Sequence, residues 1–409
     1  MRRVVITGMG AVSPLGRGVD ILVESLIEGK SGVTRLADLV EIGGLRSWVA
    51  GRVQDVDPKE IPRKYRRCMS NMSVYATLAS QEAIRQAGLS NEFCTGGQMG
   101  VVVGSTVGST QTTQEIFNDF LSSHSLERMK STVFFKIMNH SCAANVSQVL
   151  GITGRILSPS AACSTGCQAI GYGYEMIAFG KQDFMLCGGA DEFHALTAAT
   201  FDIMNAASVS FNDRPHQTPR PFDRDRDGVV CAEGSGILLL EALDSACNRG
   251  AEILGEVIGF ATVSDPSSIA HPDAVAIERC MRQAVKDAGV EPQEVDYINA
   301  HATATEQGDI AESEAIFRLF GNKVPVSSFK GHLGHAMAAS GALEMVAVVG
   351  MLNRACLIPT LNLENIDHRC NMIRHVRNVA DAPLKTAVKN NFALGGVNSS
   401  LVLRRYDND

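Results

Sequence analysis

A cysteine and two histidines, far apart along this chain, could together carry out acyl-transfer chemistry. Cys163 stands between an apolar segment, residues 155–158, and a helical stretch, residues 167–178. At such a strand-to-helix turn the helix dipole and free N–H groups favour a thiolate, and the same N–H groups can bind an oxyanion. The neighbours of Cys163 are small and leave room for a substrate. Cys163 is therefore the candidate nucleophile.

The two histidines fall at matching ends of expected elements. His301 ends the apolar segment 297–301, and His335 precedes the helical stretch 336–352. Imidazoles that face a nucleophilic cysteine can move protons during covalent catalysis. Zinc binding is the alternative use of these three side chains, but no CxxC or HxxxH spacing supports it. We therefore expect catalysis without a metal.

The composition describes an ordinary globular chain of 409 residues, with 45% hydrophobic and 20% charged residues. Its net charge of −7 argues against nucleic acid or an anionic membrane as the main partner. The other cysteines lie in mostly apolar contexts, which is typical of small core residues in a reducing compartment. The first residues resemble a strand more than a signal peptide, and no apolar run is long enough to span a membrane. We expect a cytoplasmic protein.

Two motifs that resemble ligand sites fail in detail. A dinucleotide fingerprint beginning at Gly8 and Gly10 lacks its third glycine, because Ser13 stands there. Residues 223–228 resemble a calcium loop, but Gly234 occupies the position of the required glutamate. Internal salt bridges are the better use of these charges.

The sequence contains an internal repeat, and the repeated strands and helices are those that must position the candidate catalytic residues. Three pairs of segments match in the same order: 5–14 with 257–266, 81–89 with 282–290, and 155–178 with 324–352. The repeat predicts two halves, residues 1–250 with the nucleophile and residues 251–409 with the histidine pair. Alternating strands and helices indicate mainly parallel sheets covered by helices. Packed together, the halves form an α-β-α-β-α body in which loops at corresponding strand ends meet.

Taken together, these features resemble the β-ketoacyl-acyl-carrier-protein synthases, in particular the synthase II type and its relatives in polyketide assembly. The resemblance runs end to end, through residues 4–10, 162–166, 221–234, 299–301, Asp309 with Glu312, 330–335 and 390–396. It implies a thiolase-like α/β fold in which duplicated βαβαβαββ halves form a five-layer sandwich. It also implies an acyltransferase of fatty acid or polyketide synthesis.

By this resemblance Cys163 accepts an acyl chain, while His301 and His335 promote decarboxylation of a malonyl thioester. The resulting carbanion attacks the acyl group and gives a β-ketoacyl thioester. The resemblance implies three further groups of residues and a gate. Lys330, Asp309 and Glu312 form a charged network that fixes the histidine tautomers, and the backbone N–H groups of Cys163 and Leu394 form an oxyanion hole. Phe392 and Leu394 form the acyl gate, and Thr303 and Thr305 contact the pantetheine arm.

The gate departs from the family pattern, because Leu394 stands where an aromatic residue is usual. A backbone N–H donor survives this change, whereas the shape of the gate does not. The departure predicts a specialised acyl chain, such as a polyketide or a polyene.

A basic cluster stands out in this acidic chain, formed by Arg63, Lys64, Arg66 and Arg67. The resemblance implies that this patch binds an acidic carrier protein, with a solvated helix face as the alternative. Substrates would arrive on the 4′-phosphopantetheine of that carrier, with no other cofactor. The resemblance also implies a dimer, formed with a second copy or with a homologue of the chain-length-factor type.

Three related classes fit less well. A thiolase would have a second catalytic cysteine in a CxG setting, and the chalcone-synthase group uses Cys-His-Asn. Chain-length factors, which are non-catalytic partners, typically replace the nucleophile, whereas Cys163 and both histidines are present here. The chain is therefore expected to be catalytic, with the non-catalytic subunit as the alternative.

Overall fold

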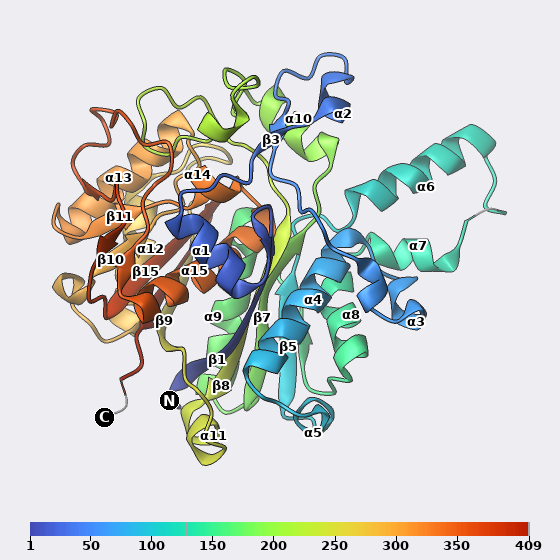
Figure 1. The fold of residues 1–409 in the computed structure, drawn as a ribbon, viewed down its shortest axis with the longest axis horizontal. Coiled ribbons are helices and arrows are strands. Elements are labelled where there is room, and N and C mark those ends of the chain that lie inside the picture. Colours follow the sequence, from blue (N-terminus) through green and yellow to red (C-terminus); the bar gives the residue numbers. More distant parts are fainter. Residues whose placement is uncertain (128, 408–409) are drawn as a thin grey trace.

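Two sets of strands with the same order lie side by side in one twelve-stranded sheet (Figure 1). The structure is a computed structural model that describes residues 1–127 and 129–407. Within the described residues, the first set follows the order β6-β5-β7-β8-β1 and the second follows β11-β10-β15-β16-β9, extended by β13. The internal repeat expected from the sequence is thus confirmed in the topology.

The first half supplies the strands β1 (Val4–Ser13), β2 (Gly16–Arg17), β3 (Thr34–Arg35), β4 (Val49–Ala50), β5 (Met99–Gly104), β6 (Ile156–Leu157), β7 (Phe184–Asp191) and β8 (Gly234–Ala242). Its α-helices are α1 (Val19–Ile27), α2 (Ala37–Val40), α3 (Arg63–Arg66), α4 (Asn71–Gln86), α5 (Asn91–Thr95), α6 (Thr110–Ser123), α7 (Ser131–Lys136), α8 (Ser141–Leu150), α9 (Thr165–Ala178), α10 (Ala195–Ile203) and α11 (Leu243–Asn248). A 3₁₀ turn, η2 (Ala162–Ser164), precedes α9.

The second half supplies β9 (Gly255–Ser264), β10 (Tyr297–Asn299), β11 (Pro325–Ser327), β12 (Cys356–Leu357), β13 (Arg374–His375), β14 (Ala380–Asp381), β15 (Thr386–Ala393) and β16 (Val397–Arg404). Its α-helices are α12 (Ala274–Asp287), α13 (Glu306–Phe320), α14 (Lys330–Leu333) and α15 (Ser340–Arg354), with the 3₁₀ turn η5 (Met337–Ala339) before α15. We propose residue 250 as the boundary between the halves, because it falls between α11 and β9.

The expectation of mainly parallel sheets is wrong, because the sheet is mixed. Three strands are parallel in the first half, β6-β5-β7, and four in the second, β13-β11-β10-β15, and the strands that follow are antiparallel. β1 and β9 then pair with each other in antiparallel register from Val4 opposite Val257 to Ile6 opposite Gly255. This pairing makes the two halves one continuous sheet.

Helices form layers on both sides of these strands and between the halves (Figure 1). α4 and α8 pack on the strands of the first half, and α12 packs on those of the second. α9 and α15 contact each other and strands of both halves, so they form the central layer. This arrangement agrees with the thiolase-like layers expected from the resemblance. Among the described residues, the helices include none that is long and apolar enough to cross a membrane.

Small residues let the two central helices approach closely. α15 is buried from Ser340 to Leu352, which explains why its sequence is apolar on all sides. A Cβ atom added at Gly166 of α9 would lie 2.6 Å from the carbonyl oxygen of Ala338, and one at Gly341 would lie 2.7 Å from the backbone nitrogen of Cys167. Any larger residue would push the helices apart. Because Cys163 precedes one helix and His335 the other, this contact sets the distance between them.

Candidate active site

Cys163 lies in the η2 turn, directly before the central helix α9. The preceding residue, Ala162, has a φ of 45°, so the chain turns sharply through a conformation that non-glycine residues rarely adopt. Cys163 is only 7% exposed and borders a cavity of about 400 Å³. The strand–turn–helix context expected from the sequence is therefore present, and it presents the sulfur to an enclosed space.

His335 is the immediate partner of this sulfur. Its Nε2 lies 2.9 Å from Cys163 Sγ, and its Nδ1 lies 2.9 Å from the hydroxyl of Ser340 at the start of α15. The backbone N–H of His335 donates to the carbonyl of Val230 at 2.7 Å. Both ring nitrogens and the backbone are thus held, with one ring nitrogen directed at the nucleophile.

His301 completes the cluster from the loop that follows β10. Its ring packs edge to face on that of His335, with the ring centres 5.4 Å apart. The donor atoms of Cys163, His301 and His335 all lie within 4.8 Å of one another. A thiol and two imidazoles at these distances also suit a soft metal ion, so the assignment to covalent catalysis depends on the groups that surround the sulfur.

Burial controls the protonation of all three side chains. It raises the pKa of the Cys163 thiol to about 11, although nearby Lys330 and two backbone N–H groups lower it. Burial also lowers the pKa of His301 and of His335 well below the ordinary value, and the positive charge of Lys330 adds to this effect. The resting site therefore holds a thiol and two neutral imidazoles. The helix terminus alone does not produce the thiolate that the sequence suggested.

The backbone N–H groups of Leu394 and of Cys163 itself lower the pKa of the Cys163 thiol, so both lie near the sulfur. Leu394 follows β15 in a tight turn whose next residues, Gly395 and Gly396, have φ of 89° and 74°. Glycine adopts this left-handed backbone without strain. The turn thus brings the N–H group of Leu394 close to the Cys163 sulfur.

The two carboxylates expected to fix the histidine tautomers bind the backbone instead. Glu312 accepts the backbone N–H groups of His301 at 2.9 Å and of Ala302 at 2.7 Å. Asp309 accepts the N–H of Ala304 at 3.2 Å, and Ala304 has a φ of 68°. These contacts hold the loop that carries His301. They do not reach an imidazole nitrogen, so they position the ring through its backbone.

Lys330 is fully buried, and its carboxylate partner is a residue that sequence reasoning missed. Its Nζ donates to Glu344 Oε1 at 2.6 Å, while Lys389 Nζ lies 2.7 Å from Glu344 Oε2. A lone carboxylate in the middle of the apolar helix α15 was the available signal. Asn391 and Ser340 were missed as well, although polar residues in fully buried elements are rarely accidental.

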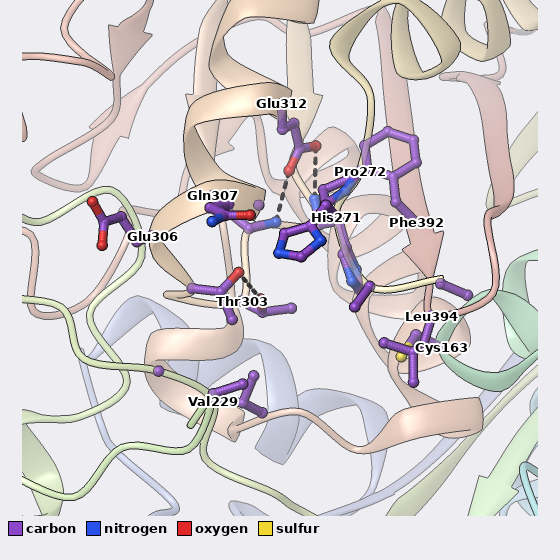
Figure 2. Close-up of a pocket in the computed structure, with 18 of the residues that line it drawn as sticks. Cys163, Val229, His271, Pro272, Thr303, Glu306, Gln307, Glu312, Phe392 and Leu394 are labelled. Carbon is purple, nitrogen blue, oxygen red and sulfur yellow. Dashed lines mark hydrogen bonds between the residues drawn. The ribbon is translucent and has the colours of Figure 1, made fainter. Parts of the chain in front are cut away.

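The expected pantetheine and gate residues line the same cavity (Figure 2). The hydroxyls of Thr303 and Thr305 lie 3.1 Å apart. The Phe392 ring packs against His301 with centres 6.1 Å apart, and Leu394, which is 40% exposed, lies next to Cys163 in Figure 2. The cavity is therefore lined by hydroxyls along its course and by two apolar side chains near the sulfur.

The expected docking cluster forms the short helix α3 and the residue after it. Three of its four basic residues are exposed, and Arg66 is half-buried. Within the part of the chain that the structure describes, no carboxylate forms an ion pair with any of Arg63, Lys64, Arg66 and Arg67. Their charge is thus available to an external partner.

Comparison with known proteins points to one family. The family model for the N-terminal domain of β-ketoacyl synthases matches residues 1–246, and that for the C-terminal domain matches residues 254–364. The 3-oxoacyl-[acyl-carrier-protein] synthase 1 of Haemophilus influenzae is 35% identical over the whole of both chains, and that of Escherichia coli is 36% identical over 99% of each. A synthase 2 from Synechocystis is 34% identical over 99% of this chain and 98% of its own length.

Solved structures give the same result. A β-ketoacyl synthase from Burkholderia phymatum superposes over both entire chains with a TM-score of 0.96 and 41% identity. The ishigamide ketosynthase/chain length factor gives a TM-score of 0.92 with 30% identity over 99% of this chain and all of that chain. A type II polyketide ketosynthase in complex with its acyl-carrier protein gives 0.91 with 31% identity and the same coverage.

The buried neutral imidazoles make the folded state sensitive to acid. Below about pH 6.5 the unfolded chain binds protons at His301 and His335 that the folded chain excludes, so their contribution is complete above that pH and is lost as the pH falls. Between pH 6.5 and 5.5 each histidine should reduce the free energy of unfolding by about 1 kcal/mol. Urea unfolding should therefore show a smaller loss for His335→Asn than for the unchanged protein.

The exposed His216 provides the matched control. His216→Asn should lose as much stability over this pH interval as the unchanged protein. Equal losses for all three proteins would contradict the assignment of a buried neutral imidazole at position 335.

Proposed function

The chain belongs to the β-ketoacyl synthase family, and on that premise we propose that it condenses an acyl group held on Cys163 with a malonyl-type thioester. It is an enzyme, an acyltransferase of the 3-oxoacyl-acyl-carrier-protein synthase type. The observation that carries the residue assignment is the 2.9 Å contact between Cys163 Sγ and His335 Nε2 beside two N–H groups. The steps below derive the reaction from that geometry.

Acyl loading begins when the Cys163 thiol attacks the thioester of an acyl carrier. Because burial raises the pKa of this thiol, it passes its proton to His335 Nε2 as it attacks. The carbonyl oxygen gains negative charge and accepts the N–H groups of Cys163 and Leu394. Collapse of the adduct expels the carrier thiolate, which takes the proton back from His335. Cys163 then holds the acyl group as a thioester.

Decarboxylation follows in the same cavity. The carbonyl oxygen of a malonyl thioester accepts hydrogen bonds from Nε2–H of the two neutral imidazoles, His301 and His335. These bonds strengthen as the carbon–carboxylate bond breaks, since its electron pair moves onto that oxygen as an enolate. CO₂ leaves. Low pKa values keep both imidazoles neutral, so each has one ring nitrogen that donates and one that accepts.

His335 thus needs Nε2 as an acceptor in one step and as a donor in another. Its Nδ1 faces the Ser340 hydroxyl, which can both donate and accept a hydrogen bond. Ser340 therefore accommodates either tautomer of His335. The hydroxyl is part of what allows one imidazole to serve both halves of the reaction.

Condensation joins the two fragments. The enolate carbon attacks the acyl carbonyl on Cys163, whose oxygen again lies at the N–H groups of Cys163 and Leu394. A carbon–carbon bond forms as the bond between the acyl carbon and the Cys163 sulfur breaks, and the departing thiolate takes up a proton from solvent. The product is a β-ketoacyl thioester, which remains on the carrier arm. Thr303 and Thr305, lining the cavity, are placed to hydrogen-bond the amides of that arm.

An acyl carrier protein is the proposed partner that delivers both substrates, each on its 4′-phosphopantetheine arm. Support comes from the unpaired basic cluster on α3, which would attract an acidic carrier. One of the similar solved structures is itself a ketosynthase in complex with its acyl-carrier protein. No cofactor beyond the carrier arm enters the steps above.

A dimer is the proposed assembly. α6 and α7 project from the body (Figure 1) and expose the large apolar side chains Phe117, Leu121 and Phe134. β6 is the last strand at one end of the sheet, and its Ile156 is exposed too. A second copy, or a homologue such as the chain-length factor of the ishigamide complex, would cover these surfaces. Because the catalytic trio is present here, this chain would be the catalytic subunit of either pair.

Cys163→Ala should abolish acyl loading, because it removes the sulfur that lies 2.9 Å from His335 Nε2. The measurement is the intact mass of the enzyme after incubation with an acyl carrier protein. Cys167→Ala, which removes a buried thiol one turn further along, should load normally. An acyl adduct on the Cys163→Ala protein would refute the proposed nucleophile.

Leu394→Phe should narrow the entrance beside Phe392 and change which acyl chains are elongated. We expect the yield of the longest products to fall by about tenfold, a size of effect that a poorly fitting pocket commonly produces. Mass spectrometry of chains on the carrier measures the profile. Leu394→Met, of nearly equal volume, should retain the original profile, and an unchanged Leu394→Phe profile would remove the gate assignment.

Charge reversal at Arg63 and Arg67 should weaken carrier binding. The double change to Glu should raise KM for the acyl carrier protein by about tenfold or more at low salt, with kcat nearly unchanged, and the effect should shrink as salt rises. Reversing the exposed Lys181 and Lys286 alters the net charge equally and should leave KM unchanged. Equal KM values for both double variants would place the docking surface elsewhere.

A further inference from the structure

Asn391 places its side-chain amide between the nucleophile and His301. It lies in β15 and is fully buried. Its Nδ2 is 3.2 Å from the carbonyl oxygen of Cys163 and 3.4 Å from Nδ1 of His301. One nitrogen with two hydrogens therefore faces two different members of the catalytic cluster.

The orientation of this amide follows from its partner at Cys163. A carbonyl oxygen can only accept a hydrogen bond, so the NH₂ group of Asn391 must face it. Turning the amide over would bring two acceptor oxygens together. With one hydrogen directed at Cys163, the second hydrogen of the same NH₂ group is available to His301 Nδ1, which must then be the acceptor.

The amide is not explained by stability alone. Its Oδ1 is buried and has no hydrogen-bond partner among the residues that the structure describes. It faces the close approach of the central helices, 2.9 Å from where a Cβ of Gly341 would lie. A buried acceptor without a partner is unfavourable, and an apolar side chain of the same shape would avoid that cost. The useful part of Asn391 is therefore its NH₂ group.

We infer that Asn391 is a positioning residue that holds His301 as the Nε2–H tautomer, the form that donates to the thioester oxygen. An imidazole whose Nδ1 accepts a hydrogen bond carries its single proton on Nε2. In the described residues, no other hydrogen bond reaches a ring nitrogen of His301. The inference rests on the proposed function and deepens it. It explains why His301 carries its proton on Nε2, from which it donates to the thioester oxygen during decarboxylation.

The charged and titratable groups around His301 agree with this assignment. Glu312 is occupied with the backbone amides of the loop, and the two buried lysines are bound to Glu344. The ring of His335 meets that of His301 by its edge. None of these groups offers Nδ1 an acceptor that would draw the proton away from Nε2. The NH₂ group of Asn391 can only donate a hydrogen bond to His301, whereas the hydroxyl of Ser340 can either donate to His335 or accept from it.

Two variants of nearly equal shape separate the hydrogen bond from packing. Asn391→Leu removes the donor, and Asn391→Asp replaces it with an acceptor that draws the His301 proton to Nδ1. Decarboxylation of malonyl carrier protein should fall by at least about tenfold in the first and about a hundredfold in the second. Acyl loading of Cys163, which uses His335, should fall by a smaller factor than decarboxylation in both variants, because both also lose the hydrogen bond to the Cys163 carbonyl. In Asn391→Asp the acid limb of the decarboxylation profile should move to higher pH, because the carboxylate favours the imidazolium.

A double-mutant cycle with His301→Asn tests whether Asn391 acts through the ring. An amide at position 301 donates without choosing a tautomer, so Asn391→Leu should have little further effect in that background. If the decarboxylation losses of the two single variants simply multiply in the double variant, Asn391 has a general structural role and the inference is overturned.

The tautomer can also be read without any turnover. In histidine labelled with ¹⁵N, the His301 signals, identified by their absence in His301→Asn, should show the ring proton on Nε2 in the unchanged protein and on Nδ1 in Asn391→Asp. A proton on Nδ1 in the unchanged protein would refute the inference even if the enzyme condenses normally. A protein with the Nε2–H tautomer that fails to decarboxylate malonyl carrier protein would instead refute the proposed function.

Discussion

The proposed catalytic trio of Cys163, His301 and His335 depends on the packing of two central helices against each other. Cys163 precedes α9 and His335 precedes α15, and the 2.9 Å contact between their side chains exists only because glycines let these helices meet backbone to backbone. The same contact buries the site. Burial keeps the sulfur protonated and the imidazoles neutral, so in the proposed reaction the thiol attacks only as its proton moves to His335. Packing in the core thereby determines both the geometry and the protonation on which the reaction depends.

Buried charge completes this environment. Lys330 and Lys389 share the single carboxylate of Glu344, and all three side chains are withdrawn from water. Two ammonium groups around one carboxylate leave positive charge beside the site. That charge opposes protonation of His301 and His335 and favours negative charge on the sulfur or on an enolate. Glu312 and Asp309, by contrast, accept backbone N–H groups of the loop that carries His301.

The sequence was sufficient to predict the trio and the duplication. Cys163, His301 and His335 each lie where a strand ends or a helix begins, and the repeat shows that those ends coincide in space. It was not sufficient to predict the direction of β8 and β16, because a strand buried on both faces has the same pattern in either direction. The pairing of Lys330 with Glu344, the contact of Asn391 with His301 and the protonation of Cys163 depend on which buried groups meet, and a pattern of residue types does not contain that information.

The pairing of β1 with β9 has a consequence for how the cavity must open. A sheet that runs unbroken through both halves cannot bend there without losing backbone hydrogen bonds, so the protein has no hinge at its midline. Access to the cavity then depends on the loops that line it rather than on closure of one half over the other. The turn that follows Leu394 is fixed in the same way, because the N–H groups of its two glycines donate to the carbonyls of Ile269 and Ala393.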